Sequence, residues 1–345
     1  MLGVGDDSDM SEVNVHRRDL ISATVGISLA AALPGAAPAA SHPRQWDAVL
    51  LRKPTSTSTM TVAQLQGALA TVVQHYTNAR YREAADAIPA VVDAADHTAQ
   101  DGSRTGAVLL TRAYILTTAI AVKERDDIAM ITADRAVQAA RLSQDPLAAA
   151  TAARAQTIVL RQRGHWEQAR QVADTAIADL SAEATARPVV AHILLETAYG
   201  AAQAGQSTDA LALWEHARKL AKQGPTVTSW PDHAGPLTSD QVDRYALCIH
   251  HLLGDTRSAL RHASRINVLA MPTAERRARY RHDSAKLYRD LGDLPRALTL
   301  LHEHEAETPQ DARRTSLRRM VSDMVATSPS LPGLRKHATL IGAAA

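Results

Sequence analysis

A short repeated pattern constrains the fold of this chain more than any other feature. In four copies a glycine precedes an alanine by five residues. These pairs are Gly164 and Ala169, Gly205 and Ala210, Gly254 and Ala259, and Gly292 and Ala297. Two weaker copies keep the alanine alone, at Ala84 and Ala129, and successive anchor alanines lie 45, 40, 41, 49 and 38 residues apart. Self-similarity at such a period is typical of stacked helix pairs.

The residues around each glycine indicate how one helix ends and the next begins. Glycine closes the last turn of a helix in the left-handed conformation. Asp255 and Asp293 directly follow their glycines and are good N-caps for the next helix. The anchor alanine then lies where two helices cross, since only a small side chain fits there. A second small residue recurs two turns later on the same face, at Ala136, Ala176 and Ala217.

These repeats predict an all-α, right-handed helical-repeat solenoid of about six helix pairs plus capping helices, over residues 61–345. The composition agrees, because hydrophobic residues make up 46% of the chain while aromatic residues make up 3% and Phe is absent. The core must therefore consist mainly of Ala, Leu, Val and Ile, and Ala and Leu favour helices.

Several function classes are excluded by the residue content. The net charge of +2 is too balanced to indicate a nucleic-acid or membrane partner. The uncharged run from Leu20 to Ser41 is interrupted by prolines, and we expect no stretch that is apolar and long enough to span a membrane. With Cys248 as the single cysteine, neither an intrachain disulfide nor a multi-cysteine zinc site can form.

The sequence offers no catalytic motif. His302 and His304 point about 200° apart on a helix and so cannot chelate one metal ion. Cys248 lacks the flanking residues of a known nucleophile, and we expect it to be a buried structural residue. No glycine-rich phosphate loop is present. We therefore expect no catalytic residues, no cofactor, no metal site and no enzymatic activity.

Two basic features remain open to more than one interpretation. Residues 275–283, ERRARYRHD, could meet acidic partners or phosphates, but the nearby acids favour a solvated helix face. The second feature is the concave groove, which the first helix of each pair should line. Counting back 7 to 15 residues from each anchor alanine gives the expected groove residues Tyr76, Tyr114, Arg154, Arg161, Tyr199, Arg244, His251, Lys286 and Arg289.

This predicted groove is basic and rich in tyrosine. It suits a peptide with an acidic side chain or a free carboxylate, because arginine binds carboxylates with two hydrogen bonds and tyrosine adds contact area at low entropic cost. The alternative is that these are ordinary solvated residues on the surface of a solenoid.

The glycine and alanine offsets resemble the tetratricopeptide repeat, although the period is longer than its usual 34 residues or so. From about residue 15 the chain also resembles the sensor region of actinobacterial XRE-type transcriptional regulators. The segment RRDLISATVGISLAAALPG resembles the linker that follows their helix-turn-helix domain, and SPSLPGLRKHATLIG (328–342) resembles their closing helix. Only 15 residues precede HRRDL, too few for a three-helix DNA-binding domain.

The resemblance implies a regulator-type sensor module that lacks its own DNA-binding domain, unless translation begins upstream and restores it. A protein or peptide ligand is the implied partner. A full-length XRE-type relative and a second copy of the chain, as a homodimer, are further candidates. Neither direct nucleic-acid binding nor membrane binding is expected.

The N-terminal part divides into an acidic stretch (1–15), a twin-arginine, Ala-rich segment (16–41) and a linker (42–60). Arg17 and Arg18 precede a weakly hydrophobic run and an A-x-A pattern at Ala37–Ala39, as in a twin-arginine export signal. Four of the first 15 residues are acidic, however, whereas a signal begins with a basic region. We therefore favour a linker in a cytoplasmic protein, and an exported helical-repeat scaffold is the alternative.

Overall fold

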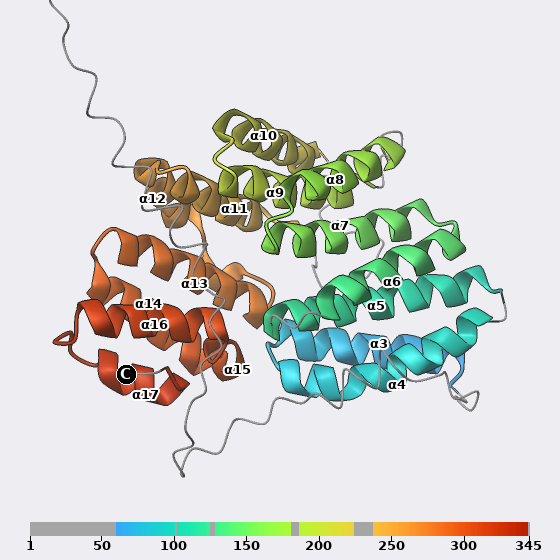
Figure 1. Cartoon of the computed structure of the whole chain (residues 1–345), viewed down its shortest axis with the longest axis horizontal. Coiled ribbons are helices and arrows are strands. Elements are labelled where there is room, and N and C mark those ends of the chain that lie inside the picture. The colour runs from blue at the N-terminus through green and yellow to red at the C-terminus, as the bar shows by residue number, and fades with distance from the viewer. Residues whose placement is uncertain (1–59, 101, 125–127, 181–185, 224–236, 344–345) are drawn as a thin grey trace, which may run out of the picture. The chain divides into compact units, whose positions relative to one another are not determined.

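A pair of helices surrounds each copy of the anchor-alanine pattern (Figure 1). The pairs are α3 (Val62–Thr77) with α4 (Tyr81–Gln100), α5 (Arg104–Glu124) with α6 (Ile128–Ser143), α7 (Pro146–Gln162) with α8 (Trp166–Leu180), α9 (Arg187–Gln203) with α10 (Ser207–Gln223), α11 (Ser239–Leu252) with α12 (Thr256–Arg265), and α13 (Ala274–Asp290) with α14 (Leu294–Glu307).

The C-terminal end adds three further helices, α15 (Pro309–Ala312), α16 (Thr315–Thr327) and α17 (Leu334–Ile341), and a short 3-10 turn, η2 (Val268–Ala270), precedes α13. This computed structural model describes residues 60–100, 102–124, 128–180, 186–223 and 237–343. Over these residues there is no strand, and the all-α helical-repeat solenoid predicted from the sequence is confirmed. The twin-arginine segment and the linker lie outside the described residues, apart from Met60.

The turns between paired helices follow the sequence pattern closely. Gly254 and Gly292 both have φ +79°, a left-handed conformation that costs other residues energy. Asp255 and Asp293 accept a hydrogen bond from the backbone N–H three residues later, as N-caps do. In the first pair Ala79 takes the left-handed position, with φ +57°, five residues before its anchor alanine. The turn is thus retained in a copy that lacks the glycine.

The six anchor alanines lie in the cores between paired helices. Their relative exposure is at most 4%, and Ala84, Ala210, Ala259 and Ala297 are completely buried. The second small residues are buried as well, including Ala136 and Ala217. The paired helices approach each other closely at these points, so a side chain larger than alanine would not fit.

Helix α5 corrects one expectation from the sequence. Residues Arg104–Lys123, with a mean hydropathy of 1.5, are long and apolar enough to cross a membrane by length and composition alone. However, 78% of that window is buried within the protein, and α5 packs against α4, α6 and α7. Its apolar character is accounted for by its place in the protein core.

The array curves until its first and last pairs meet. The Tyr81 hydroxyl in α4 donates a hydrogen bond of 2.8 Å to Asp311 in α15, and the Arg82 N–H donates one of 3.0 Å to Gln310. Helix α13 also contacts α3, and Lys123 in α5 forms an ion pair with Glu275 in α13. Figure 1 shows the same meeting of the blue α3–α4 pair with α13 and α15. The first helices consequently enclose a central space.

Candidate functional site

The central cavity is lined almost entirely by the first helices of the six pairs. A narrow part is lined by residues of α3, α5, α7, α9, α11 and α13. A wider part, of about 470 Å³, continues toward the N-terminal end of α16. Both parts share Arg161, Glu196, Arg244, Tyr245 and Arg279, so we treat them as one cavity. The first helices of the pairs thus supply most of the cavity lining.

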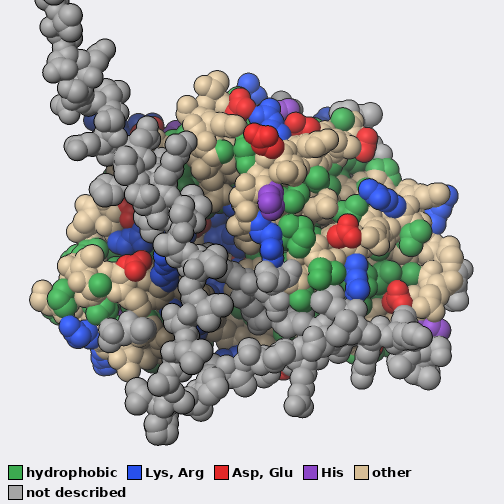
Figure 2. Space-filling model, in the orientation of Figure 1, with side chains coloured by type: hydrophobic (Ala, Val, Ile, Leu, Met, Phe, Trp, Pro, Cys, Tyr) green, Lys and Arg blue, Asp and Glu red, His purple; other side chains and the backbone are tan. Residues whose placement is uncertain are grey.

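The cavity lining is strongly basic. Among the described residues three carboxylates line it, those of Glu196, Glu275 and Asp283. The same part of the chain contributes nine Lys and Arg residues to the lining, namely Lys123, Arg154, Arg161, Arg163, Arg244, Arg276, Arg279, Lys286 and Arg314. The whole chain carries only +2, so positive charge is concentrated inside the curve. Figure 2 shows Lys and Arg side chains near the middle of one face, between α13 and the helices opposite.

Six of the nine predicted groove residues line this cavity: Tyr76, Arg154, Arg161, Tyr199, Arg244 and Lys286. The other three lie elsewhere. Tyr114 is packed in the core of the N-terminal pairs. His251 lies 3.0 Å from Asp290, and Arg289 forms an ion pair of 2.7 Å with the same carboxylate. All three therefore lie outside the cavity lining.

Glu196 joins three neighbouring first helices. Its carboxylate lies 3.4 Å from Arg154 Nη2 and 3.3 Å from Arg161 Nη2, both in α7, and it accepts a hydrogen bond of 2.5 Å from the Tyr245 hydroxyl in α11. Burial by itself raises the pKa of Glu196, but Arg161, Arg154 and Tyr245 outweigh burial and lower it to about 2. Glu196 thus stays charged and partly neutralises the two arginines.

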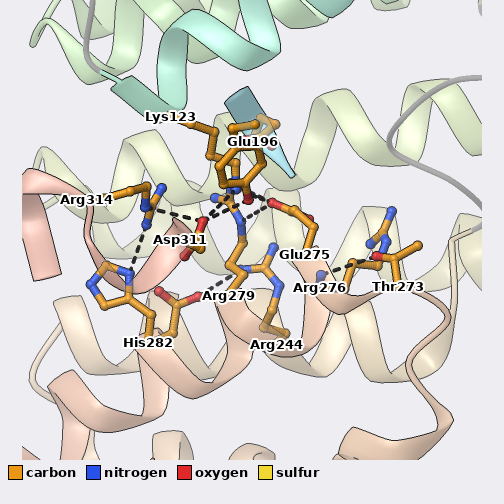
Figure 3. Close-up of polar contacts among 12 residues, drawn as sticks. Lys123, Glu196, Arg244, Thr273, Glu275, Arg276, Arg279, His282, Asp311 and Arg314 are labelled. Carbon is orange, nitrogen blue, oxygen red and sulfur yellow. Dashed lines mark hydrogen bonds and ion pairs between the residues drawn. The ribbon is translucent and has the colours of Figure 1, made fainter. Parts of the chain in front are cut away.

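A second cluster of buried charged residues lies where the first and last parts of the array meet (Figure 3). Lys123 is ion-paired with Glu275, lies 3.7 Å from Asp311, and stands 5.1 Å from the centre of the Tyr81 ring. Burial lowers the pKa of Lys123 to about 8, although Glu275 and Asp311 oppose that change. Arg279 approaches Glu275 from the cavity side at 3.3 Å. The cluster ties α5 to α13 and α15.

Arg276 differs from the other buried arginines of the cavity. Its guanidinium forms no ion pair or hydrogen bond within the part of the chain that the structure describes, whereas Arg244 lies 2.9 Å from Asp283. Arg276 is only 8% exposed, and its backbone N–H donates to the Thr273 hydroxyl. Burial lowers the pKa of Arg276 to about 10, against the influence of Glu275. Arg276 is therefore a buried cation that forms no ion pair with any carboxylate of the described residues.

The interpretation of residues 275–283 as a solvated helix face is wrong. Glu275, Arg276, Arg281 and His282 are all buried, at no more than 9% exposure, because α13 lies inside the curve with neighbours on several sides. Arg276 and Arg279 were missed because they lie 21 and 18 residues before Ala297, beyond the 7 to 15 counted. First helices of up to 21 residues present more turns to the cavity than that window covers.

Other candidate groups carry no evident chemistry. Cys248 is buried beside α12, as expected of a structural cysteine, and burial raises the pKa of its thiol well above the ordinary value. Among the described residues no group of three or more His, Cys, Asp or Glu could hold a metal ion. No protein-family model matches the chain, and no curated protein matches it.

Proposed function

We propose that this chain is a non-enzymatic binding protein that takes an acidic peptide or another carboxylate ligand in its central cavity. The observation that carries the proposal is the charge of the lining, where nine basic side chains face three carboxylates in a chain of net charge +2. Such a lining attracts anions, and arginines there can bind carboxylates with paired hydrogen bonds.

The arrangement of the cavity also supports a sensor role. Residues of all six helix pairs line it, so a ligand would contact the first and last repeats at once. A ligand that binds the closed array and not an open one stabilises the closed form. This fits the regulator-type sensor module implied by the sequence resemblance, with a full-length XRE-type relative or a second copy as the protein partner.

Two further expectations follow from the sensor proposal. The purified protein should not retard DNA in salt-matched gels, and a shifted band would contradict the proposal. We also place the protein in the cytoplasm, so mass spectrometry of the protein from its host should find residues 16–41 still attached. A mature N-terminus near Ala40 would favour the exported scaffold instead.

The test of ligand binding compares two peptides that differ in charge alone. Acetyl-Ala-Glu-Ala-Asp-Ala-amide and its Gln/Asn counterpart are titrated at the same ionic strength, since salt screens such interactions. We expect the acidic peptide alone to bind and to raise the melting temperature.

Lys286→Gln should weaken binding of the acidic peptide by about fivefold, because Lys286 lines the cavity without an ion-pair partner among the described residues. Lys219→Gln, on the exposed side of α10, is the matched control and should leave binding unchanged. Equal binding of both peptides would overturn the proposal, as would the failure of the acidic peptide and of small carboxylates alike to bind.

A further inference from the structure

The narrow part of the central cavity is lined by two buried polar side chains, Gln241 and Arg276, whose hydrogen-bonding capacity is not fully used. Gln241 in α11 is 5% exposed, and its side-chain oxygen Oε1 accepts no hydrogen bond. Arg276 in α13 is 8% exposed and has no carboxylate partner within the described ranges. Both line the same part of the cavity. A buried acceptor and a buried cation each cost stability when left unpaired, so a ligand that satisfies both gains from each.

Helix capping explains why Gln241 is available. In α3 the side chain of Gln64 turns back and accepts a hydrogen bond of 2.8 Å from the backbone N–H of the N-cap Thr61, closing a capping box. Gln241 occupies the same third position after its N-cap Thr238, whose hydroxyl accepts from the Gln241 N–H. The Gln241 Oε1 atom makes no such return contact. It lines the cavity instead.

Arg276 occupies the corresponding position in α13, three residues after the N-cap Thr273. Helices α11 and α13 contact each other, so the two third-position side chains come from the beginnings of neighbouring helices. The partial positive charge of both helix N-termini adds to that of the guanidinium. This end of the cavity therefore favours an anion next to a hydrogen-bond donor.

Apolar side chains of α5 and α7 also line the narrow part, beside Thr118, Arg154 and Arg161 of the same two helices. Ile115, Ala119 and Val122 lie on one face of α5, and Ala155 and Ile158 lie on one face of α7. An inorganic anion would leave these apolar side chains in contact with water, whereas an alkyl group would cover them.

We propose that this part of the cavity binds a small apolar acid that carries an O–H or N–H group beside its carboxylate, the simplest class being branched-chain 2-hydroxy acids. Arg276 binds the carboxylate, Gln241 Oε1 accepts the neighbouring donor, and the apolar side chains of α5 and α7 contact the alkyl group. The inference rests on the proposed function and names the ligand class for it.

The test uses four probes at pH 7 and constant ionic strength: 2-hydroxy-4-methylpentanoate, 4-methylpentanoate, the methyl ester of the hydroxy acid, and inorganic phosphate. We expect the hydroxy acid to bind about tenfold more tightly than the acid without the hydroxyl, since an unpaired buried acceptor is satisfied only by the former. The ester and phosphate should bind more weakly still, because one lacks the charge and the other the alkyl group.

Three variants assign these preferences to residues. Gln241→Leu should abolish the preference for the hydroxy acid over 4-methylpentanoate. Arg276→Gln should abolish the preference for acid over ester. Gln64→Leu, at the closed capping box of α3, is the matched control and should alter neither preference.

Two patterns of results separate this inference from the proposed function. If the acidic peptide binds but the hydroxyl and the alkyl group make no difference among the small acids, or phosphate binds as well as the hydroxy acid, the ligand class is wrong and the proposed function stands. If no anion binds at all, both are wrong.

Discussion

Replacing Glu196 by glutamine tests whether the buried carboxylate holds three helices together through its charge. Glutamine has nearly the same shape and can still accept the hydrogen bond of Tyr245, but it removes the negative charge that Arg154 and Arg161 share. The pKa of Glu196 is lowered from 4.5 to about 2, and the carboxylate is only 6% exposed. This corresponds to about 3 kcal/mol of folding stability at pH 7.

The sign of the pH dependence follows from the lowered pKa. The carboxylate of the folded protein stays charged below the pH at which that of the unfolded chain becomes protonated, so its contribution is complete above about pH 5.5 and is lost as the pH falls toward 2. At pH 3 it should amount to roughly 1–2 kcal/mol. The difference between wild type and Glu196→Gln should therefore shrink by about half or more between pH 7 and pH 3.

Urea unfolding curves of both proteins over this pH range provide the measurement. Glu215→Gln is the matched control, because Glu215 forms an ion pair with Arg218 on the partly exposed face of α10 and its loss should change stability by no more than about 0.5 kcal/mol. An equal destabilisation at pH 7 and pH 3 would show that Glu196→Gln acts through packing, and no destabilisation at pH 7 would refute the reasoning.

The remaining predictions are checked by the same unfolding curves. Ala210→Leu overfills a completely buried helix crossing and should cost about 1–3 kcal/mol, while Ala212→Leu on the exposed side of the same helix should be nearly neutral. Gly292→Ala, at φ +79°, should cost about 1 kcal/mol, whereas Gly67→Ala, in open space within α3, should stabilise by roughly 0.5–1 kcal/mol. Tyr81→Phe removes a buried hydrogen bond between α4 and α15 and should cost about 1–3 kcal/mol, with faster amide hydrogen exchange in both helices. Unchanged stability of Ala210→Leu would contradict the packing account, and unchanged exchange in Tyr81→Phe would contradict the closing contact.

The fold was predictable because its determinants are local. A glycine or another left-handed residue, a capping aspartate and an alanine at a fixed offset describe one helix turn and one helix crossing, and each is visible within about ten residues, as around Gly254 and Ala259. The closure of the array was not predictable from these signals. It depends on contacts between residues more than 200 positions apart, such as Tyr81 with Asp311.

The site was only partly predictable for a related reason. Counting back from the anchor alanines placed Arg154, Arg161 and Arg244 on the first helices and inside the cavity. Spacing alone does not show that α13 is surrounded by other helices. The charges around Arg276 were therefore predicted to form a solvated helix face. Spacing also does not show which glutamine caps its own helix. Gln64 and Gln241 both lie three residues after their N-caps, but only the Gln64 side chain accepts the return hydrogen bond from the N-cap.

The most direct test of the central claim is the ratio of the dissociation constants of the acidic pentapeptide and its Gln/Asn counterpart, measured by isothermal titration at matched ionic strength. A basic cavity that binds carboxylates predicts a ratio strongly in favour of the acidic peptide, reduced by Lys286→Gln and unaffected by Lys219→Gln. Equal dissociation constants for the two peptides, or a ratio that Lys286→Gln leaves unchanged, would contradict the account.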